Sequence, residues 1–164
     1  MKPIWYLLKC PEGKECEYTE RFSEFVNPDG LSEAVCFQYQ RLIRYGGQWH
    51  MENRTLLPGY VFLFGTDAAL KEGGKEQVKT WRNRLLIPCE TPYLRELCQE
   101  GNMIGMSRGI IQNGSLIITG GPLKGREELV RKINRHKRTA EIEIPFAEDK
   151  KRVTVGLEVY KKQA

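Results

Sequence analysis

Hydrophobic and polar positions follow a two-residue period in several stretches of the chain, which is the spacing of a β-strand with one buried face. In the first half, the apolar and aromatic run at 4–10 predicts one strand, and the alternation at 35–40 predicts another. The segment LLPGYVFLFG at 56–65, entered through Pro-Gly, is the strongest strand signal in the sequence. Residues 45–53 between these last two strands are expected to form a loop that connects a hairpin.

Other segments have the three-to-four-residue spacing of an amphipathic helix. Residues 14–26 place apolar side chains on one stripe, and the stop NPDG at 27–30 follows directly. A second helix is expected at 74–81. A short third helix is expected to begin at Thr91-Pro92, with threonine as N-cap and proline at the first helical position.

The pattern changes after about residue 100. Residues 101–113 are glycine-rich and have no clear period, which predicts a linker. Four strand-like runs then follow at close spacing, which is typical of a small barrel. These runs are Leu116–Thr119, Leu129–Ile133, Thr139–Ile144 and Val153–Val159. The pattern therefore predicts an α+β protein with two domains: an antiparallel sheet flanked by helices at 1–100 and a small β-barrel at 114–164.

The net charge of +5 is concentrated in the second predicted domain. Residues 1–113 contain 14 Lys and Arg against 14 Asp and Glu, so their charges cancel. Residues 114–164 contain 12 against 7, which accounts for the whole excess. Such a concentration is expected of a nucleic-acid contact, although a solubilising surface also produces it.

The cysteine and histidine content indicates neither a metal site nor a disulfide framework. Five cysteines and two histidines form no CxxC pair and no two-plus-two grouping of the kind that binds zinc. We expect reduced thiols that pack as small apolar side chains, with no metal and no cofactor. No apolar run approaches the roughly 20 residues that cross a bilayer, and the start lacks the apolar region of a signal peptide. A soluble, unexported protein of a reducing cytoplasm is expected.

An enzymatic function is disfavoured by the absence of a catalytic constellation. A nucleophile needs a base within hydrogen-bond reach, and the base needs an orienting group. His50 and His136 lie in different predicted domains, and GxSxG, Walker and HExxH motifs are missing. Carboxylates are scattered and alternate with basic residues. We therefore expect a binding protein rather than an enzyme.

The strand LPGYVFLF carries large apolar side chains on both faces. Tyr60, Phe62 and Phe64 project from one face, and Val61 and Leu63 project from the other. One set can be core while the other lines an exposed aromatic hollow that receives a partner. Alternatively, helices cover both faces. Periodicity does not separate these two interpretations.

The most concentrated positive charge lies at 131–138, which we call the basic tip. Six of its eight residues are Arg, Lys or His. A turn between two strands holds such side chains in water, where several cations can meet phosphates together and release counterions. Arginine also binds phosphate in a bidentate manner and stacks on unpaired bases. The alternative is a solvated hairpin whose charges prevent edge-to-edge association. The charge excess of the domain brings the two interpretations to parity.

These segments together resemble the NusG family of bacterial transcription elongation factors. The opening WYLLKC at 5–10, with Gly13 and Lys14-Glu15 after it, is similar to the first strand and helix start of the family's N-terminal (NGN) domain. The segment LLPGYVFL at 56–63 matches the family's most specific signature. GPLKG at 121–125, followed by strands and a charged turn, resembles a KOW motif. The resemblance covers nearly the whole chain.

The resemblance implies a two-domain factor: an NGN domain, and an SH3-like KOW barrel at 114–164. The first domain would bind the clamp helices of the largest RNA polymerase subunit through an apolar hollow and hold the clamp closed, which suppresses pausing. Such a factor acts only through its higher affinity for the elongating state than for the paused one. The residues that fall on the family's binding strands are Trp5, Lys9, Leu57, Pro58, Tyr60 and Phe62.

Departures from the family pattern are typical of a specialised, operon-specific paralogue. The hairpin loop at about 44–54 is short, RNRL at 82–85 replaces a Gly-Val turn, and Glu128 replaces a KOW glycine. The tract KINRHKRTAEIEI at 132–144 is similar to the KOW hairpin of LoaP-type antiterminators, which implies recruitment by a structured nascent RNA. The residues expected to contact nucleic acid are Lys124, Arg131, Lys132, Arg135, His136, Lys137 and Arg138.

Three functions are thus carried forward. The first is a monomeric processive antiterminator that binds polymerase through its first domain and an RNA hairpin through its basic barrel, with no membrane contact. The second is a housekeeping-type NusG whose barrel binds a termination factor or a ribosomal protein. The third is a ribosome-associated KOW protein that binds structured RNA. The clustered charge favours the first over the second, because a protein-docking barrel needs an apolar face more than a cationic tip.

Overall fold

The computed structural model describes residues 4–24, 31–65, 86–89, 93–98, 101–146 and 149–163. The chain divides into two compact units, each built from two separate stretches. Unit 1 comprises residues 1–36 and 57–92, and unit 2 comprises residues 37–56 and 93–164. The predicted helix at 74–81 and the predicted start of another at Thr91-Pro92 fall on residues outside the described ranges; within 93–98 there is one short helix, α4 (Leu94–Leu97).

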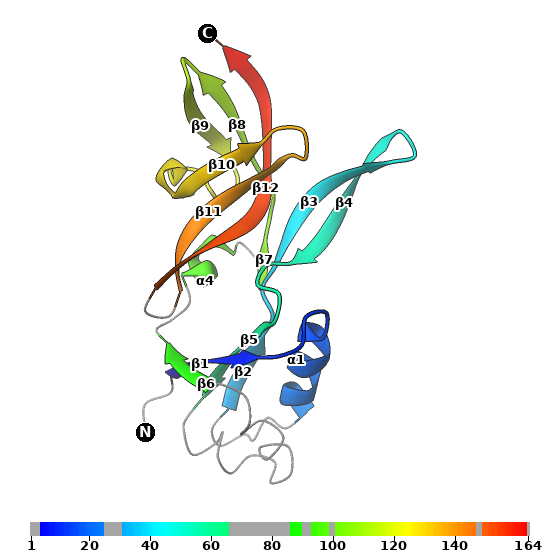
Figure 1. Cartoon of the computed structure of the whole chain (residues 1–164), viewed down its shortest axis with the longest axis vertical. Helices are drawn as coiled ribbons and strands as arrows, with labels where there is room; N and C mark the ends of the chain where they lie inside the picture. Colours follow the sequence, from blue (N-terminus) through cyan, green and yellow to red (C-terminus); the bar gives the residue numbers. More distant parts are fainter. Residues whose placement is uncertain are drawn as a thin grey trace. The chain divides into compact units, whose positions relative to one another are not determined.

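Unit 1 contains a four-stranded antiparallel sheet in the order β2-β5-β1-β6 (Figure 1). Its elements are β1 (Ile4–Lys9), α1 (Glu15–Glu24), β2 (Leu31–Val35), β5 (Tyr60–Gly65) and β6 (Leu86–Cys89). The predicted strand at 4–10, helix at 14–26 and strand within 56–65 are confirmed. Leu8, Val61 and Leu63 are fully buried and form the centre of its core.

A buried carboxylate fixes the Pro-Gly turn that precedes β5. Glu15, in the first turn of α1, is 3% exposed, and its two carboxylate oxygens accept hydrogen bonds from the Gly13 amide at 3.1 Å. The Gly59 amide donates to Glu15 Oε1 at 2.8 Å. Backbone amides and a helix N-terminus are the groups that stabilise a buried carboxylate. The turn of the LPGY segment is therefore tied directly to the start of α1.

Unit 2 begins with a long hairpin where the sequence predicted a loop. β3 (Gln38–Tyr45) and β4 (Gln48–Thr55) pair in antiparallel register, and β7 (Met103–Ile104) pairs parallel to β3. The prediction of a loop at 45–53 is wrong, because only Gly46-Gly47, with φ of 61° and 76°, turns between the strands. This left-handed pair is the two-residue turn that matches strand twist. Polar residues on both faces of β4 concealed the strand.

The predicted strand at 35–40 is two strands rather than one. β2 ends at Val35 and β3 begins at Gln38, so the alternation runs across a break between them. The division between the two units also lies there, between Cys36 and Phe37. Phe37 is fully buried in unit 2, which explains why apolar spacing continues where the strand does not.

A five-stranded sheet forms the rest of unit 2, in the order β10-β11-β12-β8-β9. Its strands and the short helices of this region are α4 (Leu94–Leu97), β8 (Ser107–Gln112), β9 (Ser115–Gly120), η1 (Glu127–Leu129), β10 (Val130–Asn134), β11 (Thr139–Phe146) and β12 (Asp149–Gln163). All pairs are antiparallel except β12 with β8, which is parallel. The four strands predicted after residue 114 are confirmed, and Ile142, Val155 and Leu157 form their core.

The predicted linker at 101–113 contains β7 and β8 instead of an irregular connection. Position 109 on β8 requires glycine because β8 and β9 approach each other closely at this point. A Cβ at this position would lie 2.6 Å from the carbonyl oxygen of Ile117 on the neighbouring strand β9. Glycine in a strand marks such a close approach as often as it marks flexibility. The glycine content of residues 101–113 was therefore wrongly interpreted as the mark of an irregular linker. The assignment of two functional modules stays a prediction.

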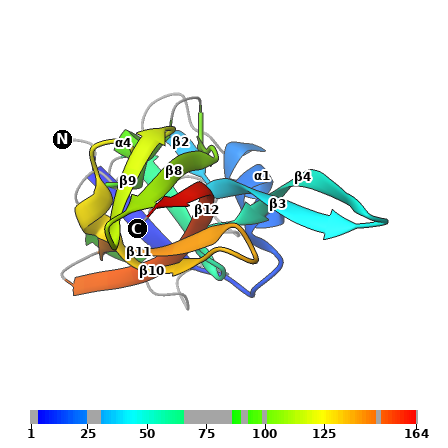
Figure 2. The same cartoon turned by 90° about the horizontal axis from the view of Figure 1, so that it is seen from above.

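The described part of the chain is mostly β, with one helix of three turns and two short ones. The predicted α+β class is therefore confirmed only in that strands and helices both occur, with strands predominating in the described residues. The SH3-like barrel stays a prediction, because among the described strands β9 and β10 are the unpaired edges of an open sheet. Within unit 2, β12 contacts β3, and the β3–β4 hairpin extends away from the five-stranded sheet (Figure 2). No helix in the described ranges is long and apolar enough to span a membrane.

Candidate nucleic-acid interface

The basic tip forms the tight turn between β10 and β11, as the sequence predicted. Residues 135–138 make the turn, and Arg138 has a φ of 55° in the left-handed region. The Arg138 amide donates to the Arg135 carbonyl at 3.3 Å, and the Lys137 amide donates to Asn134 Oδ1 at 2.9 Å. Asparagine side chains commonly close turns in this way. The turn therefore has a defined shape and a defined direction for each side chain.

Arg131 at the start of the tip is exposed on β10 but has two hydrogen-bond partners within the sheet region. Its Nε donates to Glu143 Oε2 across the strands at 2.8 Å, and its guanidinium also donates to the Glu128 carbonyl at 2.7 Å. The hydrogen bond from Arg131 lowers the pKa of the Glu143 carboxyl below its ordinary value. The prediction that Arg131 contacts nucleic acid is disfavoured by these contacts, since a phosphate would compete with two existing acceptors.

Arg138 at the other end of the tip also has partners within unit 2. Its guanidinium lies 3.8 Å from the centre of the Trp49 ring on β4 and 3.5 Å from Glu158 on β12. The side chain is only 29% exposed. Arg138 thus connects the β10–β11 turn with β4 and β12. This structural role was not predicted from the sequence. The run of basic residues does not act as a single unit.

The remaining members of the tip are available to a ligand. Lys132, Arg135, His136 and Lys137 are exposed, and among the described residues no carboxylate forms an ion pair with them. Lys124 is likewise exposed, on the separate turn after β9. Arg135, His136 and Lys137 on the turn, together with Lys132 on the adjoining strand β10, make a site that attracts anions.

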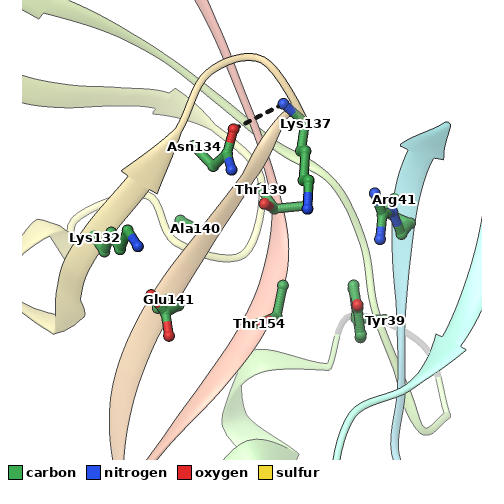
Figure 3. A pocket seen from close by; sticks show the side chains of 9 residues that line it. All are labelled: Tyr39, Arg41, Lys132, Asn134, Lys137, Thr139, Ala140, Glu141 and Thr154. Carbon is green, nitrogen blue, oxygen red and sulfur yellow. Dashed lines mark hydrogen bonds between the residues drawn. The ribbon is translucent and has the colours of Figure 1, made fainter. Parts of the chain in front are cut away.

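A pocket of about 270 Å³ opens beside the tip (Figure 3). One wall is β3, and the other walls are β10, β11 and β12. We call it the β3–β11 pocket. Its lining residues are Tyr39, Arg41, Lys132, Asn134, Lys137, Thr139, Ala140, Glu141 and Thr154. Lys132 and Lys137 belong to the predicted site, whereas Tyr39 and Arg41 were missed. Tyr39 lies on the strand predicted at 35–40 and Arg41 directly follows it, but sequence alone does not place β3 beside β11.

The residues predicted to bind polymerase lie mainly in the core of unit 1. Trp5, Leu57 and Phe62 are 6%, 2% and 4% exposed, while Tyr60 is half-buried. Pro58 and Lys9 are exposed. The expectation of an open aromatic hollow is therefore wrong at its centre, and the interpretation in which both faces of β5 are covered fits better.

The register of β1 and β5 shows which of their side chains share one face of the sheet. Trp5 pairs with Phe64, and Lys9 pairs with Tyr60, so directly opposed side chains lie on the same side of the sheet. The Trp5 and Phe64 rings pack with their centres 5.0 Å apart. On this face Lys9 is exposed and Tyr60 is half-buried at one end of the strand pair, and Phe64 is half-buried at the other.

The described cysteines are free thiols and form no metal site. Cys10 and Cys36 are buried, Cys16 is exposed and Cys98 is half-buried. Burial, followed by the charges of Cys16 and Glu15, raises the pKa of the Cys36 thiol to about 12. No group of three or more metal-binding side chains occurs among the described residues. These observations agree with the predicted use of cysteine as a small apolar side chain, except at Cys16.

Comparison with known proteins finds similarity to solved structures. No family model matches the chain, and no curated protein matches it. The fold is similar to that of NusG from Thermotoga maritima, whose structure was determined in a study of domain interaction in that protein. The likeness covers 97% of this chain and 95% of the other, with 15% sequence identity and a TM-score of 0.46.

Proposed function

We propose that this chain is a NusG-type transcription elongation factor that binds nucleic acid, specifically a structured nascent RNA, through the basic tip. The order of motifs in the sequence, with LLPGYVFL before a KOW-like segment, is the first support. The second is the end of the β10–β11 hairpin, where Lys132 on β10 and Arg135, His136 and Lys137 on the turn form no ion pair with a carboxylate among the described residues. That turn is the observation that carries the proposal.

The chemistry of this turn matches phosphate better than a protein surface. A protein-docking site needs a central apolar anchor in addition to any charged rim. The exposed residues of the tip are instead cationic. Each phosphate that such a cation neutralises releases counterions from the nucleic acid and steepens the salt dependence of binding. Because the turn is short and projects from two strands, it fits a groove or loop of folded RNA.

The proposal assigns polymerase binding to unit 1, at the accessible end of the face that β1 and β5 share. Tyr60 is half-buried and Lys9 is exposed there, next to the exposed Pro58. Tyrosine has an apolar ring with a polar tip, which suits a contact that is partly wet. Trp5, Leu57 and Phe62 would support this contact from the core rather than make it. The factor would favour elongation only as far as it binds the elongating enzyme more tightly than the paused one.

Binding of a fluorescein-labelled RNA stem–loop with a randomised loop tests the nucleic-acid part. Fluorescence anisotropy is measured at several salt concentrations for the full chain, for Arg135→Ala/Lys137→Ala and for Lys161→Ala/Lys162→Ala. The control pair removes the same charge from the exposed end of β12. We expect at least a tenfold loss of affinity for the tip variant only, with a salt slope reduced by about 0.7–0.9 for each lost phosphate contact.

Two outcomes would contradict the proposal. Equal losses in both variants would show that net charge alone attracts RNA and that the tip is no site. Unchanged affinity in the tip variant would assign RNA binding elsewhere, or to no part of the chain. A DNA stem–loop of matching sequence is the parallel probe, and equal affinity for DNA would contradict the assignment to RNA.

A further inference from the structure

The β3–β11 pocket contains a buried donor without an acceptor. Arg41 on β3 lines the pocket, and its Nε is buried with no hydrogen-bond partner among the residues that the structure describes. Buried polar atoms nearly always have a partner, and an unmet donor of a charged group is costly. An acceptor that enters the pocket would remove this cost. The arrangement is therefore typical of a site that is completed by a ligand.

The charges that line the pocket select an anion. Arg41, Lys132 and Lys137 contribute three cations, against the single carboxylate of Glu141. Lys132 stands directly opposite Glu141 in the β10–β11 register, so these two charges offset one another. Arg41 and Lys137 remain, and Figure 3 shows them on opposite sides of the same opening. Two cations, one from β3 and one from the β10–β11 turn, that face a common space form an anion clamp.

Neutral donors and the size of the pocket narrow the choice of anion. The hydroxyl groups of Thr139, which is 6% exposed, and of Thr154 belong to the same lining. A tetrahedral anion with several oxygen atoms can accept from a guanidinium, an ammonium and hydroxyl groups together. The volume of about 270 Å³ is just below the usual range for small-molecule pockets, about 300–1,000 Å³. It accommodates a phosphate group with part of its sugar.

We propose that the β3–β11 pocket binds one backbone phosphate of the RNA that lies on the basic tip, with Arg41 and Lys137 sharing its oxygen atoms. Lys137 belongs to both the tip and the pocket, so a strand that crosses the tip at Lys137 passes the pocket opening. The inference that the phosphate belongs to RNA rests on the proposed function, whereas the inference that the pocket binds an anion rests on its lining residues alone. The β3–β4 hairpin thereby becomes part of the RNA interface.

Arg41→Gln and Arg44→Gln form a matched pair for the test. Both remove one positive charge from β3, but Arg44 lies outside the pocket lining, close to the Trp49 ring. With the same labelled RNA stem–loop, we expect Arg41→Gln to weaken binding about tenfold and to reduce the salt slope by about 0.7–0.9. Arg44→Gln is expected to change affinity less than twofold. Glu141→Gln is expected to strengthen binding severalfold, because it removes the only negative charge of the pocket.

Two further readouts separate binding from a structural role. Arg41→Gln is expected to melt at or above the temperature of the unmodified chain, because it deletes an unpaired buried donor. In the NMR spectrum of the full chain, inorganic phosphate and the RNA stem–loop should each shift the backbone amides of Thr139 and Thr154. Neither probe should shift them in Arg41→Gln.

The outcomes distinguish this inference from the proposed function. If Arg41→Gln binds RNA as tightly as the unmodified chain while the tip variant does not, the pocket proposal fails and the proposed function stands. If inorganic phosphate shifts the two threonine amides but RNA does not, the pocket binds free phosphate and the RNA assignment is wrong. If Arg41→Gln lowers the melting temperature, Arg41 stabilises the fold without a ligand, and the pocket proposal fails.

Discussion

Replacing Arg138 by alanine should destabilise unit 2 rather than simply weaken RNA binding. The guanidinium lies 3.8 Å from the Trp49 ring centre and 3.5 Å from Glu158, with both members of the ion pair less than one third exposed. A cation–π contact contributes about 0.5–2 kcal/mol, depending on its exposure. The ion pair, still partly wet, adds at most about 1 kcal/mol. Arg138→Ala should therefore cost about 0.5–3 kcal/mol.

The backbone at this position changes the estimate little. Alanine is about as strained as arginine at a φ of 55°, and the hydrogen bond from the Leu157 amide to the Arg138 carbonyl, at 3.0 Å, does not involve the side chain. Arg138→Gly relieves the strain, so it should be the less destabilising change of the two by up to about 1 kcal/mol, because the left-handed region is open to glycine. The order of stability expected is unmodified chain, then glycine variant, then alanine variant.

Thermal unfolding followed by circular dichroism measures these differences. Each kcal/mol lowers the melting temperature of a chain of this size by about 2–4 °C. Arg135→Ala, on the same turn but exposed, is the matched control and should stay within about 0.5 kcal/mol of the unmodified chain. A double-mutant cycle with Trp49→Ala should give a coupling energy of about 0.5–2 kcal/mol. Equal melting temperatures for Arg138→Ala and Arg135→Ala, with no coupling, would refute the structural role.

Three other predictions follow from particular contacts. Because its thiol pKa is about 12, Cys36 should resist iodoacetamide at pH 9 while the exposed Cys16 reacts; equal labelling, read by mass spectrometry, would contradict its burial. The unfolded thiol releases its proton at lower pH than the folded one, so urea denaturation should show a contribution to stability that is complete below about pH 9 and lost towards pH 12. The Glu143 carboxyl has a lowered pKa, so its stabilising contribution is present above the ordinary pKa and is lost as the pH falls through the folded value. In Arg131→Gln the pKa of Glu143 should rise to the ordinary range, which an NMR titration measures. An unchanged pKa would exclude the hydrogen bond from Arg131 as the cause of the lowering. Gly156→Ala places a Cβ against the β3 backbone, so it should cost about 1–3 kcal/mol by overpacking; an unchanged urea midpoint would show that β12 and β3 do not touch.

The elements that sequence predicted well are those whose signal is local. β1, β5 and the strands from Ser115 onward have apolar residues at the strand period, and α1 has a clear stripe followed by a stop. β4 was missed because polar residues occupy both of its faces, and β8 was missed because Gly109 suggested flexibility. In both cases the tertiary structure explains the residue pattern. β4 projects in a hairpin, and β8 packs against β9 too closely at Gly109 to leave room for a side chain.

The site could be predicted only in part for the same reason. The basic run at 131–138 was visible, but its division into bound and available cations depends on Glu143 across the hairpin and on Glu158 and Trp49, which are far from it in sequence. Arg41 has no unusual neighbours in the sequence, and it becomes notable only beside β11. Long-range pairing, rather than residue type, decides which of the charges can meet a ligand.

Ultraviolet crosslinking of the full chain to the RNA stem–loop tests the central claim most directly. The crosslinked peptides are identified by mass spectrometry, in the unmodified chain and in Arg135→Ala/Lys137→Ala. The account predicts crosslinks within residues 132–137 and at Tyr39 or its immediate neighbours, and a marked loss of both in the variant. Crosslinks confined to other parts of the chain, or a pattern that the variant leaves unchanged, would contradict it.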